Sequence, residues 1–481
     1  MLDPRARSGP VALSFATPSL VALLVVVFLV VALPVGALAA AGGVPLAADE
    51  GGSAVRSFSG SSGGDLAGQT PAQTPAQARA QTTAQTPAQT RAQTTGDDAD
   101  AIRLRTELAQ TDERGTVGVT TRAAIPDRVT ALDVTLLSVG ASDAVDADGF
   151  VAGDGSGPGE SVWEWDGETA TPSLTYTVAA NDTVDRSGPF AVDGTYRFAD
   201  AGEWALVQTP RVAAAWSYTG QYAGQVRLDR ETVVTGEGVA SRSMAFLGPH
   251  EEYVHEAAGQ RYRLIVPDAA APVAEPAAVF GVFADAATAL RVGARDDEVV
   301  AFVAPTGTVS WGVRGLQTGD ADLWVRDEEP TETVTDVWTH EYVHTRQAYR
   351  AEASGRWITE ASATHYAALF ALDRGAADFD AFERTLARGE REPAAAAVLA
   401  APRTWAGNAD YTKGALVAGE IDRRLRTATD GAASLATVLR ELNEADEPIT
   451  NAHVLDAVEA AAATGADDAT AAEIRAAAER L

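Results

Sequence analysis

The segment THEYVHT (residues 339–345) carries two histidines four residues apart, with a glutamate directly after the first. At 3.6 residues per turn, His340 and His344 project from the same face of a helix, so both imidazoles can reach one metal ion. Glu341 is then placed to touch a metal-bound water rather than the metal itself. This HExxH pattern predicts two metal ligands and a general base.

The helix that carries this motif is predicted to begin just after Thr331. Thr331 can act as its N-cap and Glu332 as its first residue. Val334, Val337 and Trp338 then form an apolar stripe that leads into the motif.

A second segment, GPHEEYVHE (residues 248–256), looks similar but is expected to have a different role. His250 and His255 are five residues apart, about 140° around a helix, so their side chains would diverge. Pro249 and the glycines nearby favour a turn that leads into a strand. We therefore expect surface histidines here and no metal site.

A third metal ligand is expected in WITEASATHY (residues 357–366). Glu360 follows His344 after fifteen intervening residues, which leaves room for a loop near Gly355 and a return helix. A carboxylate from that helix would complete a His2Glu zinc site whose fourth position is open to water, as catalytic zinc requires. The alternative for Glu360 is an ordinary surface acid. Thr364, one turn later, is a candidate to support a ligand by a hydrogen bond.

Together, these motifs resemble those of the gluzincin metallopeptidases (peptidase MA type), in which HExxH precedes a W-x-x-E-G-x-A-x-Y helix. The segment DYTKGA (residues 410–415) is similar to the Y-x-K-G segment of zinc aminopeptidases in that group. By motif, the resemblance covers roughly residues 276–430, and the order of β-rich and helical regions is similar to the glycyl-aminopeptidase branch. The resemblance implies a Tyr411 hydroxyl that stabilises the tetrahedral oxyanion. It also implies Zn2+ as the cofactor, held by His340, His344 and Glu360.

Three features depart from the family pattern. Ala361 stands where the family usually has glycine, the interval before Glu360 is shorter than in the best-known aminopeptidases, and no G-x-M-E-N element precedes the motif. The nearest counterpart of the G-x-M-E-N element is RGLQ (residues 314–317), where Gln317 stands in place of the acidic residue that would bind a free amino terminus. Aminopeptidase and endopeptidase action both stay open, and the strand at Gly315 is expected to pair with an extended peptide.

The composition predicts an acidic, solvated surface. The chain has 67 acidic and 37 basic residues, a formal net charge of −30, and a single lysine, Lys413. The acids are spread along the chain, which favours a hydrated shell over a docking surface for cations. Such a balance resembles proteins of salt-loving archaea, so a haloarchaeal origin is expected. Nucleic acid is not an expected partner, because no basic patch is present. The absence of cysteine excludes disulfides and thiolate chemistry.

The first hundred residues predict export and a tether. Residues 11–33 carry no charge and can cross a bilayer of roughly 30 Å hydrocarbon thickness, with arginines before them and acids only after them. Residues 1–40 are therefore either a membrane anchor or a signal peptide cleaved near residues 37–39. Both place the protein on the extracellular face of the cell membrane or outside the cell. Residues 41–100 are rich in Gln, Thr, Pro and Ala and are expected to be a disordered linker.

The rest of the chain predicts an α+β, multidomain fold. Residues 101–235 alternate apolar and polar positions between Gly, Asp and Pro, which is typical of an N-terminal β-sandwich. Residues 236–481 are expected to form a gluzincin-type catalytic domain. It would have a small α/β lobe at 236–330 and an Ala-rich helical lobe at 331–481.

These features predict an exported zinc-dependent metallopeptidase that acts on a peptide or protein substrate. Glu341 would take a proton from the zinc-activated water and pass it to the leaving amine. The alternative, favoured by Ala361 and Gln317, is a non-catalytic extracellular binding module with a vestigial peptidase domain. Zinc with a purely structural role fits less well, because His2Glu ligation leaves one coordination position unfilled.

Overall fold

The computed structural model describes residues 100–137, 143–154, 159–183, 196–219 and 225–480. The predicted anchor or signal segment, and all but the last residue of the predicted linker, lie outside these ranges. Within them, none of the helices combines the length and the apolar character that a membrane crossing needs.

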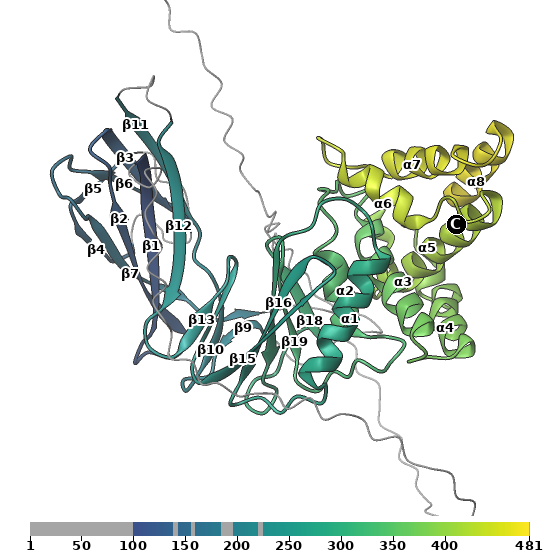
Figure 1. Ribbon diagram of the computed structural model, residues 1–481, viewed down its shortest axis with the longest axis horizontal. Coiled ribbons are helices and arrows are strands. Elements are labelled where there is room, and N and C mark those ends of the chain that lie inside the picture. The colour runs from purple at the N-terminus through teal and green to yellow at the C-terminus, as the bar shows by residue number, and fades with distance from the viewer. Residues whose placement is uncertain (1–99, 138–142, 155–158, 184–195, 220–224, 481) are drawn as a thin grey trace, which may run out of the picture. The chain divides into compact units, whose positions relative to one another are not determined.

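Two sheets in the N-terminal part of the described chain share one hydrophobic core (Figure 1). The first has the order β12–β1–β2–β7–β4, with all neighbours antiparallel except the parallel pair β1–β12, and the second has the order β11–β3–β6–β5. Their bounds are β1 Ala101–Gln110, β2 Thr116–Ala124, β3 Val129–Leu136, β4 Val145–Asp148, β5 Phe150–Ala152, β6 Ser161–Trp165, β7 Ser173–Ala179, β11 Val212–Tyr218 and β12 Arg227–Val234. In β1, Ile102, Leu104 and Leu108 are buried while Arg103 and Arg105 are exposed, as the period of a half-buried strand requires.

A third sheet buries both of its faces. Its order is β13–β14–β10–β9–β8, from β8 (Asp182–Thr183), β9 (Tyr196–Asp200), β10 (Ala205–Gln208), β13 (Gly238–Ala240) and β14 (Met244–Leu247). Ala205 and Val207 belong to the core of the first two sheets, whereas Leu206 packs in a cluster with Phe302 and Trp324. The predicted domain boundary at residue 235 therefore falls between strands of one sheet.

The fourth sheet positions the HExxH segment. Its order is β15–β16–β17–β19–β18, from β15 (His250–Ala257), β16 (Gln260–Pro267), β17 (Glu298–Ala304), β18 (Gly315–Thr318) and β19 (Asp322–Arg326). Strands β16, β17 and β19 are parallel, and the two edge strands are antiparallel to their neighbours. The continuous apolar run of β17 fits a strand covered on both faces: Val299 and Ala301 contact the helical side, and Val300 and Phe302 contact the third sheet.

One helix lies between strands of the fourth sheet in the sequence, and the other helices form the C-terminal part of the described chain. They are α1 Pro276–Ala289, which connects β16 to β17, then α2 Val337–His344, α3 Trp357–Asp373, α4 Phe379–Leu386, α5 Ala409–Ala428, α6 Leu435–Asn443, α7 Asn451–Ala463 and α8 Asp468–Arg480, with short 3-10 turns η3 Ala387–Glu390, η4 Ala394–Ala396 and η5 Pro402–Thr404. The α+β prediction is confirmed as a mixed fold of several sheets and eight α-helices among the described residues. The sandwich and the catalytic domain as separate units stay predictions.

The predicted start of the HExxH helix is wrong. Helix α2 begins at Val337, and its N-cap is Asp336, whose side chain accepts from the Trp338 backbone N–H at 3.0 Å. Asp336 is fully buried and also pairs with Arg374 at 2.6 Å. Thr331 lies in the preceding turn, where its carbonyl accepts from Arg374. A buried carboxylate with a distant arginine partner therefore fixes the start of the helix.

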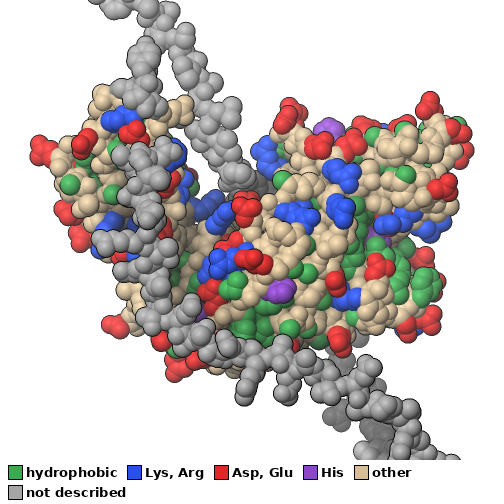
Figure 2. Space-filling model, in the orientation of Figure 1, with side chains coloured by type: hydrophobic (Ala, Val, Ile, Leu, Met, Phe, Trp, Pro, Cys, Tyr) green, Lys and Arg blue, Asp and Glu red, His purple; other side chains and the backbone are tan. Residues whose placement is uncertain are grey.

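Charged side chains of both signs lie on the visible face of the protein. Figure 2 shows Asp and Glu side chains scattered over the visible face, with Lys and Arg side chains among them. They do not gather into one block there, so the dispersed charge of the sequence is also dispersed on that face.

Candidate metal centre

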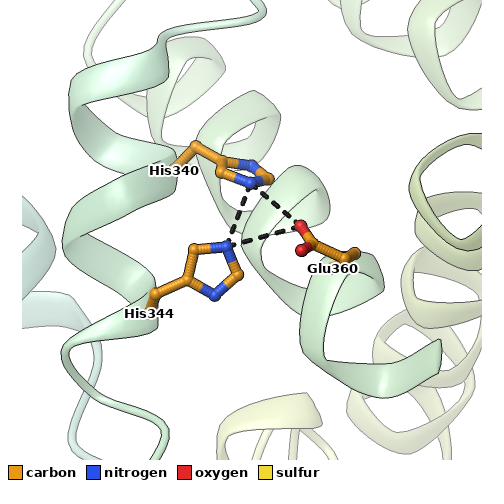
Figure 3. A group of neighbouring side chains, drawn as sticks. All are labelled: His340, His344 and Glu360. Carbon is orange, nitrogen blue, oxygen red and sulfur yellow. Dashed lines mark hydrogen bonds and ion pairs between the residues drawn. The ribbon is translucent and has the colours of Figure 1, made fainter. Parts of the chain in front are cut away.

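The three predicted metal ligands converge on one point (Figure 3). His340 and His344 project from successive turns of α2, and Glu360 projects from the first turn of α3. His340 Nε2 lies 3.1 Å from His344 Nε2 and 3.2 Å from Glu360 Oε2, and His344 Nε2 lies 3.4 Å from the same carboxylate oxygen. The side chains are 15%, 12% and 25% exposed, so the cluster is largely shielded from solvent.

The spacing and the donor types fit a zinc ion. Zinc binds imidazole nitrogen and carboxylate oxygen at about 2.0–2.2 Å, so two ligands at a tetrahedral angle lie about 3.4 Å apart. The three observed separations, 3.1 to 3.4 Å, are close to that edge length. Two imidazoles and one carboxylate also form a donor set that zinc accepts.

Gln347 fixes the tautomer of His344. The Gln347 side-chain nitrogen donates to the Thr359 carbonyl and to Ser362 Oγ, both at 2.9 Å, so its Oε1 faces His344 Nδ1 at 2.8 Å. An amide oxygen only accepts, so Nδ1 carries a proton and Nε2 is the nitrogen left for the metal position beside Glu360. This is the usual way in which a neighbouring group orients a metal-binding histidine.

The carboxylate and the imidazoles shift each other's protonation. Burial alone would raise the pKa of Glu360, but His344 and His340 outweigh burial and hold that pKa well below its usual value. Burial also opposes a charged His344, yet the Glu360 carboxylate outweighs it and raises the His344 pKa to about 9. In the protein without metal, the site therefore favours positive charge beside Glu360 at neutral pH, and a divalent cation satisfies the same demand.

The Glu341 side chain projects from α2 toward the edge strand β18. It is 6% exposed, and burial raises its pKa. The Gln317 backbone N–H donates to its carboxylate. A Cβ on Gly315 would lie 2.7 Å from Val337 Cγ1 and 2.8 Å from Glu341 Oε1, so only glycine allows the strand to approach this closely. The backbone of β18 thus confines the predicted base.

Tyr411 lies in the first turn of α5, directly over the metal centre. Its ring stacks on His340 with centroids 5.7 Å apart and planes 9° apart. Tyr411, His340 and Glu341 line one cavity of about 410 Å3. Lys413, in the same segment, donates to the carbonyls of Ala395 at 3.1 Å and Ala397 at 2.7 Å, so the single lysine ties the η4 turn to α5.

The Ala361 departure is accommodated by the opposite helix. Ala361 is fully buried in α3, and a Cβ on Gly414 of α5 would lie 2.8 Å from the Ala361 Cβ. The glycine of the Y-x-K-G segment therefore provides the room that the methyl of Ala361 occupies.

The other sequence expectations have different outcomes. GPHEEYVHE forms strand β15, as predicted, and His255 there stacks on Phe280 with centroids 5.4 Å apart. Thr364 lines the cavity, but its buried hydroxyl has no hydrogen-bond partner among the described residues, so it supports no ligand by a hydrogen bond there. The ligand-supporting residue is Gln347, which sequence reasoning missed. The sequence signal for Gln347 was its spacing: a residue three positions after His344 lies on the same face of a helical turn.

Comparisons with known proteins give structural neighbours only. No family model and no curated protein matches the chain. An aminopeptidase N family protein from Idiomarina loihiensis is 13% identical, with a TM-score of 0.47 over 70% of this chain and 69% of that chain. The M1 zinc metallopeptidase from Deinococcus radiodurans is 14% identical, with a TM-score of 0.46 over 79% and 94%; a mutant of it bound to a Tyr-Ser-Ala substrate is 15% identical, with the same TM-score and coverage. Likeness at this level does not establish function, which depends on the side chains described above.

Proposed function

We propose that the chain is a zinc-dependent metallopeptidase of the gluzincin type. The observation that carries this proposal is the convergence of His340, His344 and Glu360 to within 3.4 Å of one another, with Glu341 directly beside them. These three side chains would hold the ion, and Glu341 and Tyr411 would act on the substrate. The neighbour that binds a Tyr-Ser-Ala peptide is compatible with a peptide substrate for this chain.

The side chains of the cavity suit hydrolysis of a peptide bond. When bound, zinc supplies a positive charge that acidifies water and polarises a carbonyl group. Glu341 accepts the proton of the attacking water and delivers it to the leaving amine, and a raised pKa helps it to hold that proton between the two steps. The Tyr411 hydroxyl donates a hydrogen bond to the oxygen that becomes negative, a contribution of ~10²–10³ in rate.

The edge strand β18 is the proposed track for the substrate backbone. It pairs with β19 on one side only. On its other edge the Gln317 N–H is taken by Glu341, so an extended peptide would pair with the backbone groups that Glu341 leaves free. Gln317 directs its amide nitrogen to the Gly319 carbonyl at 2.6 Å and offers no carboxylate to an amino terminus. The cavity's own acids are Asp336, which is engaged by Arg374, and the proposed base. We therefore expect cleavage that does not depend on a free amino terminus.

The decisive experiment compares Glu341→Gln with Glu332→Gln, an exposed glutamate just ahead of the same helix. We expect both variants to bind about one zinc per chain and only Glu341→Gln to lose peptide hydrolysis. Substrates with free and acetylated amino termini, assayed with and without a chelator, complete the design. Hydrolysis by Glu341→Gln at the wild-type rate would show that the base is assigned wrongly.

The rival function is a non-catalytic binding module that retains a metal site. Gln317, in place of the expected acid, is the observation that favours it. The same experiment separates the two proposals: stoichiometric zinc without hydrolysis of any peptide in the wild type supports the binding module.

We also propose that the protein is exported. The support is the uncharged segment at residues 11–33, which lies outside the described part of the chain. Amino-terminal sequencing of the mature protein distinguishes a cleaved signal from a retained anchor, and recovery in the cytoplasmic fraction contradicts export.

A further inference from the structure

Several polar side chains that line the cavity beside the candidate metal centre have no role in the proposed hydrolysis. Its two acids are engaged or assigned: Asp336 accepts from Thr339 and Arg374, and Glu341 is the proposed base. Among the lining residues that the structure describes, the groups without such commitments are donors.

Three of these donors lie on different elements. Arg388, in η3, is an exposed arginine at the edge of the cavity that makes no hydrogen bond or ion pair with another described side chain. Thr364, in α3, has a buried hydroxyl with no partner among the described residues. Asn408 occupies the N-cap position of α5, but its side chain does not cap the helix. A guanidinium, an amide N–H and a hydroxyl are all able to donate to one carboxylate.

The position of Arg388 is set by its neighbour. A Cβ on Gly389 would lie 2.7 Å from the Thr412 carbonyl and 2.8 Å from Lys413 Cα, so the glycine lets η3 pack directly on the first turn of α5. This contact brings Arg388 to the same turn that carries Tyr411. Arg388 and Tyr411 therefore line the same cavity.

A second positive group faces the cavity from β18 and β19. Arg314 and Arg326 both line it, and both pair with the single buried carboxylate of Glu329. The exposed Glu328 adds a second carboxylate, 3.2 Å from Arg326, so both guanidinium groups are paired within the protein. Among the arginines that line the described cavity, Arg388 is the one that is left without a carboxylate partner.

From these observations we propose that the cavity binds a carboxylate of the substrate, with Arg388 as the main specificity-determining residue. The inference rests on the proposed peptidase function and names its substrate class: peptides with an acidic group at a fixed distance from the cleaved bond. That group is either an Asp or Glu side chain or the carboxyl terminus of the peptide. Arginine matches a carboxylate with two parallel N–H donors, which lysine cannot reproduce.

The probes are short alanine-rich peptides in which one position at a time carries Glu or Gln. Each is made with a C-terminal acid and with a C-terminal amide, so that the two sources of carboxylate are separated. We expect the wild type to have a kcat/KM about ten- to a hundredfold higher for the carboxylate than for the matched amide at one position. Arg388→Gln should remove most of that ratio, and Arg388→Lys should restore only part of it.

Arg384→Gln is the matched control, because Arg384 is an exposed arginine one turn before Arg388 that does not line the cavity. It should leave the acid-to-amide ratio at the wild-type value. Equal rates for Glu and Gln peptides, and for acid and amide termini, would overturn the carboxylate site while leaving the peptidase proposal intact. So would an equal loss of the ratio in Arg384→Gln and Arg388→Gln.

Binding measurements separate this inference from the function on which it rests. The same peptides are titrated into zinc-loaded Glu341→Gln by calorimetry, where no turnover is needed. Tighter binding of the carboxylate peptides, lost on adding Arg388→Gln, supports the site even if the wild type hydrolyses none of them. Equal Kd values for the Glu and Gln peptides contradict it, whatever the activity of the wild type.

Discussion

Gln347 is predicted to control zinc affinity without touching the metal. The substitution Gln347→Met keeps the length of the side chain but removes the acceptor that faces His344 Nδ1 at 2.8 Å. It also removes both donations, to the Thr359 carbonyl and to Ser362 Oγ, that connect Gln347 to α3. Thr359 directly precedes Glu360, so the substitution loosens ligands on both helices.

The expected cost follows from these contacts. Loss of the group that orients a metal-binding histidine typically weakens metal affinity about 10- to 100-fold. Because Gln347 also ties down the turn that carries Glu360, we expect the upper half of that range, or about 2–3 kcal/mol. Gln347→Glu keeps an acceptor for His344 but loses the donations to α3, and it should therefore fall between the wild type and Gln347→Met.

The assay is zinc affinity by competition with a chromophoric chelator, with helix content followed by circular dichroism. Gln317→Met is the matched control: its amide is tied to its own turn at Gly319 and contacts no metal ligand. The control should bind zinc as the wild type does. Wild-type affinity in Gln347→Met, or the same loss in both Met variants, would refute the role given to Gln347.

Three other changes test the packing and the charge of the protein. Gly315→Ala places a methyl group 2.8 Å from Glu341 Oε1, so kcat should fall about a hundredfold while the zinc content stays unchanged. An unchanged kcat would mean that β18 does not confine the base. Asp422, 7% exposed, has a pKa lowered to about 2: burial would raise it, but His365, Arg426 and a backbone N–H outweigh burial. Its contribution to stability is therefore present above about pH 4 and lost as the pH falls through about 2. At pH 7, Asp422→Asn should lower the free energy of unfolding in denaturant by about 2 kcal/mol, against less than about 1 kcal/mol for Glu420→Gln, whose partners Arg423 and Arg424 are exposed. Raising KCl from 0.1 to 2 M should raise the melting temperature, because it shortens the Debye length from about 10 Å to below 3 Å and so screens the repulsion within a net charge of −30. An equal or lower melting temperature at 2 M KCl contradicts this interpretation of the acidic surface.

The parts of the site that depend on helical period could be predicted from the sequence. His340 and His344 share a face because of their spacing alone, and the same arithmetic separates His250 from His255. The placement of Glu360 needed only a return helix of ordinary length. Local geometry is enough for such features, because each depends on residues close together in the chain or on one loop.

Features decided by distant partners could not be predicted in this way. Asp336 begins α2 because Arg374, at the far end of α3, pairs with it in a buried position. The Ala395 and Ala397 carbonyls, which accept hydrogen bonds from the Lys413 ammonium, lie in a turn whose sequence shows no helical or strand periodicity. The third sheet likewise combines strands from both sides of residue 235, because Leu206 on one face and Val207 on the other are both buried by partners far away in the sequence.

The methyl group of Ala361 is weak evidence for a vestigial site, because it affects packing and not chemistry. A Cβ on Gly414 would lie 2.8 Å from the Ala361 Cβ, so this helix crossing has room for one methyl group and α5 leaves that room free. This helix crossing sets the relative positions of Glu360 and Tyr411. Glu360 directly precedes Ala361 on α3, and Tyr411 lies three residues before Gly414 on α5. A decayed site would be revealed by ligands that diverge or by a base and an oxyanion donor that no longer face one cavity. In this chain the ligand atoms lie within 3.4 Å of one another. Glu341 and Tyr411 line the same cavity, so the exchange of glycine for alanine is compatible with an intact catalytic geometry.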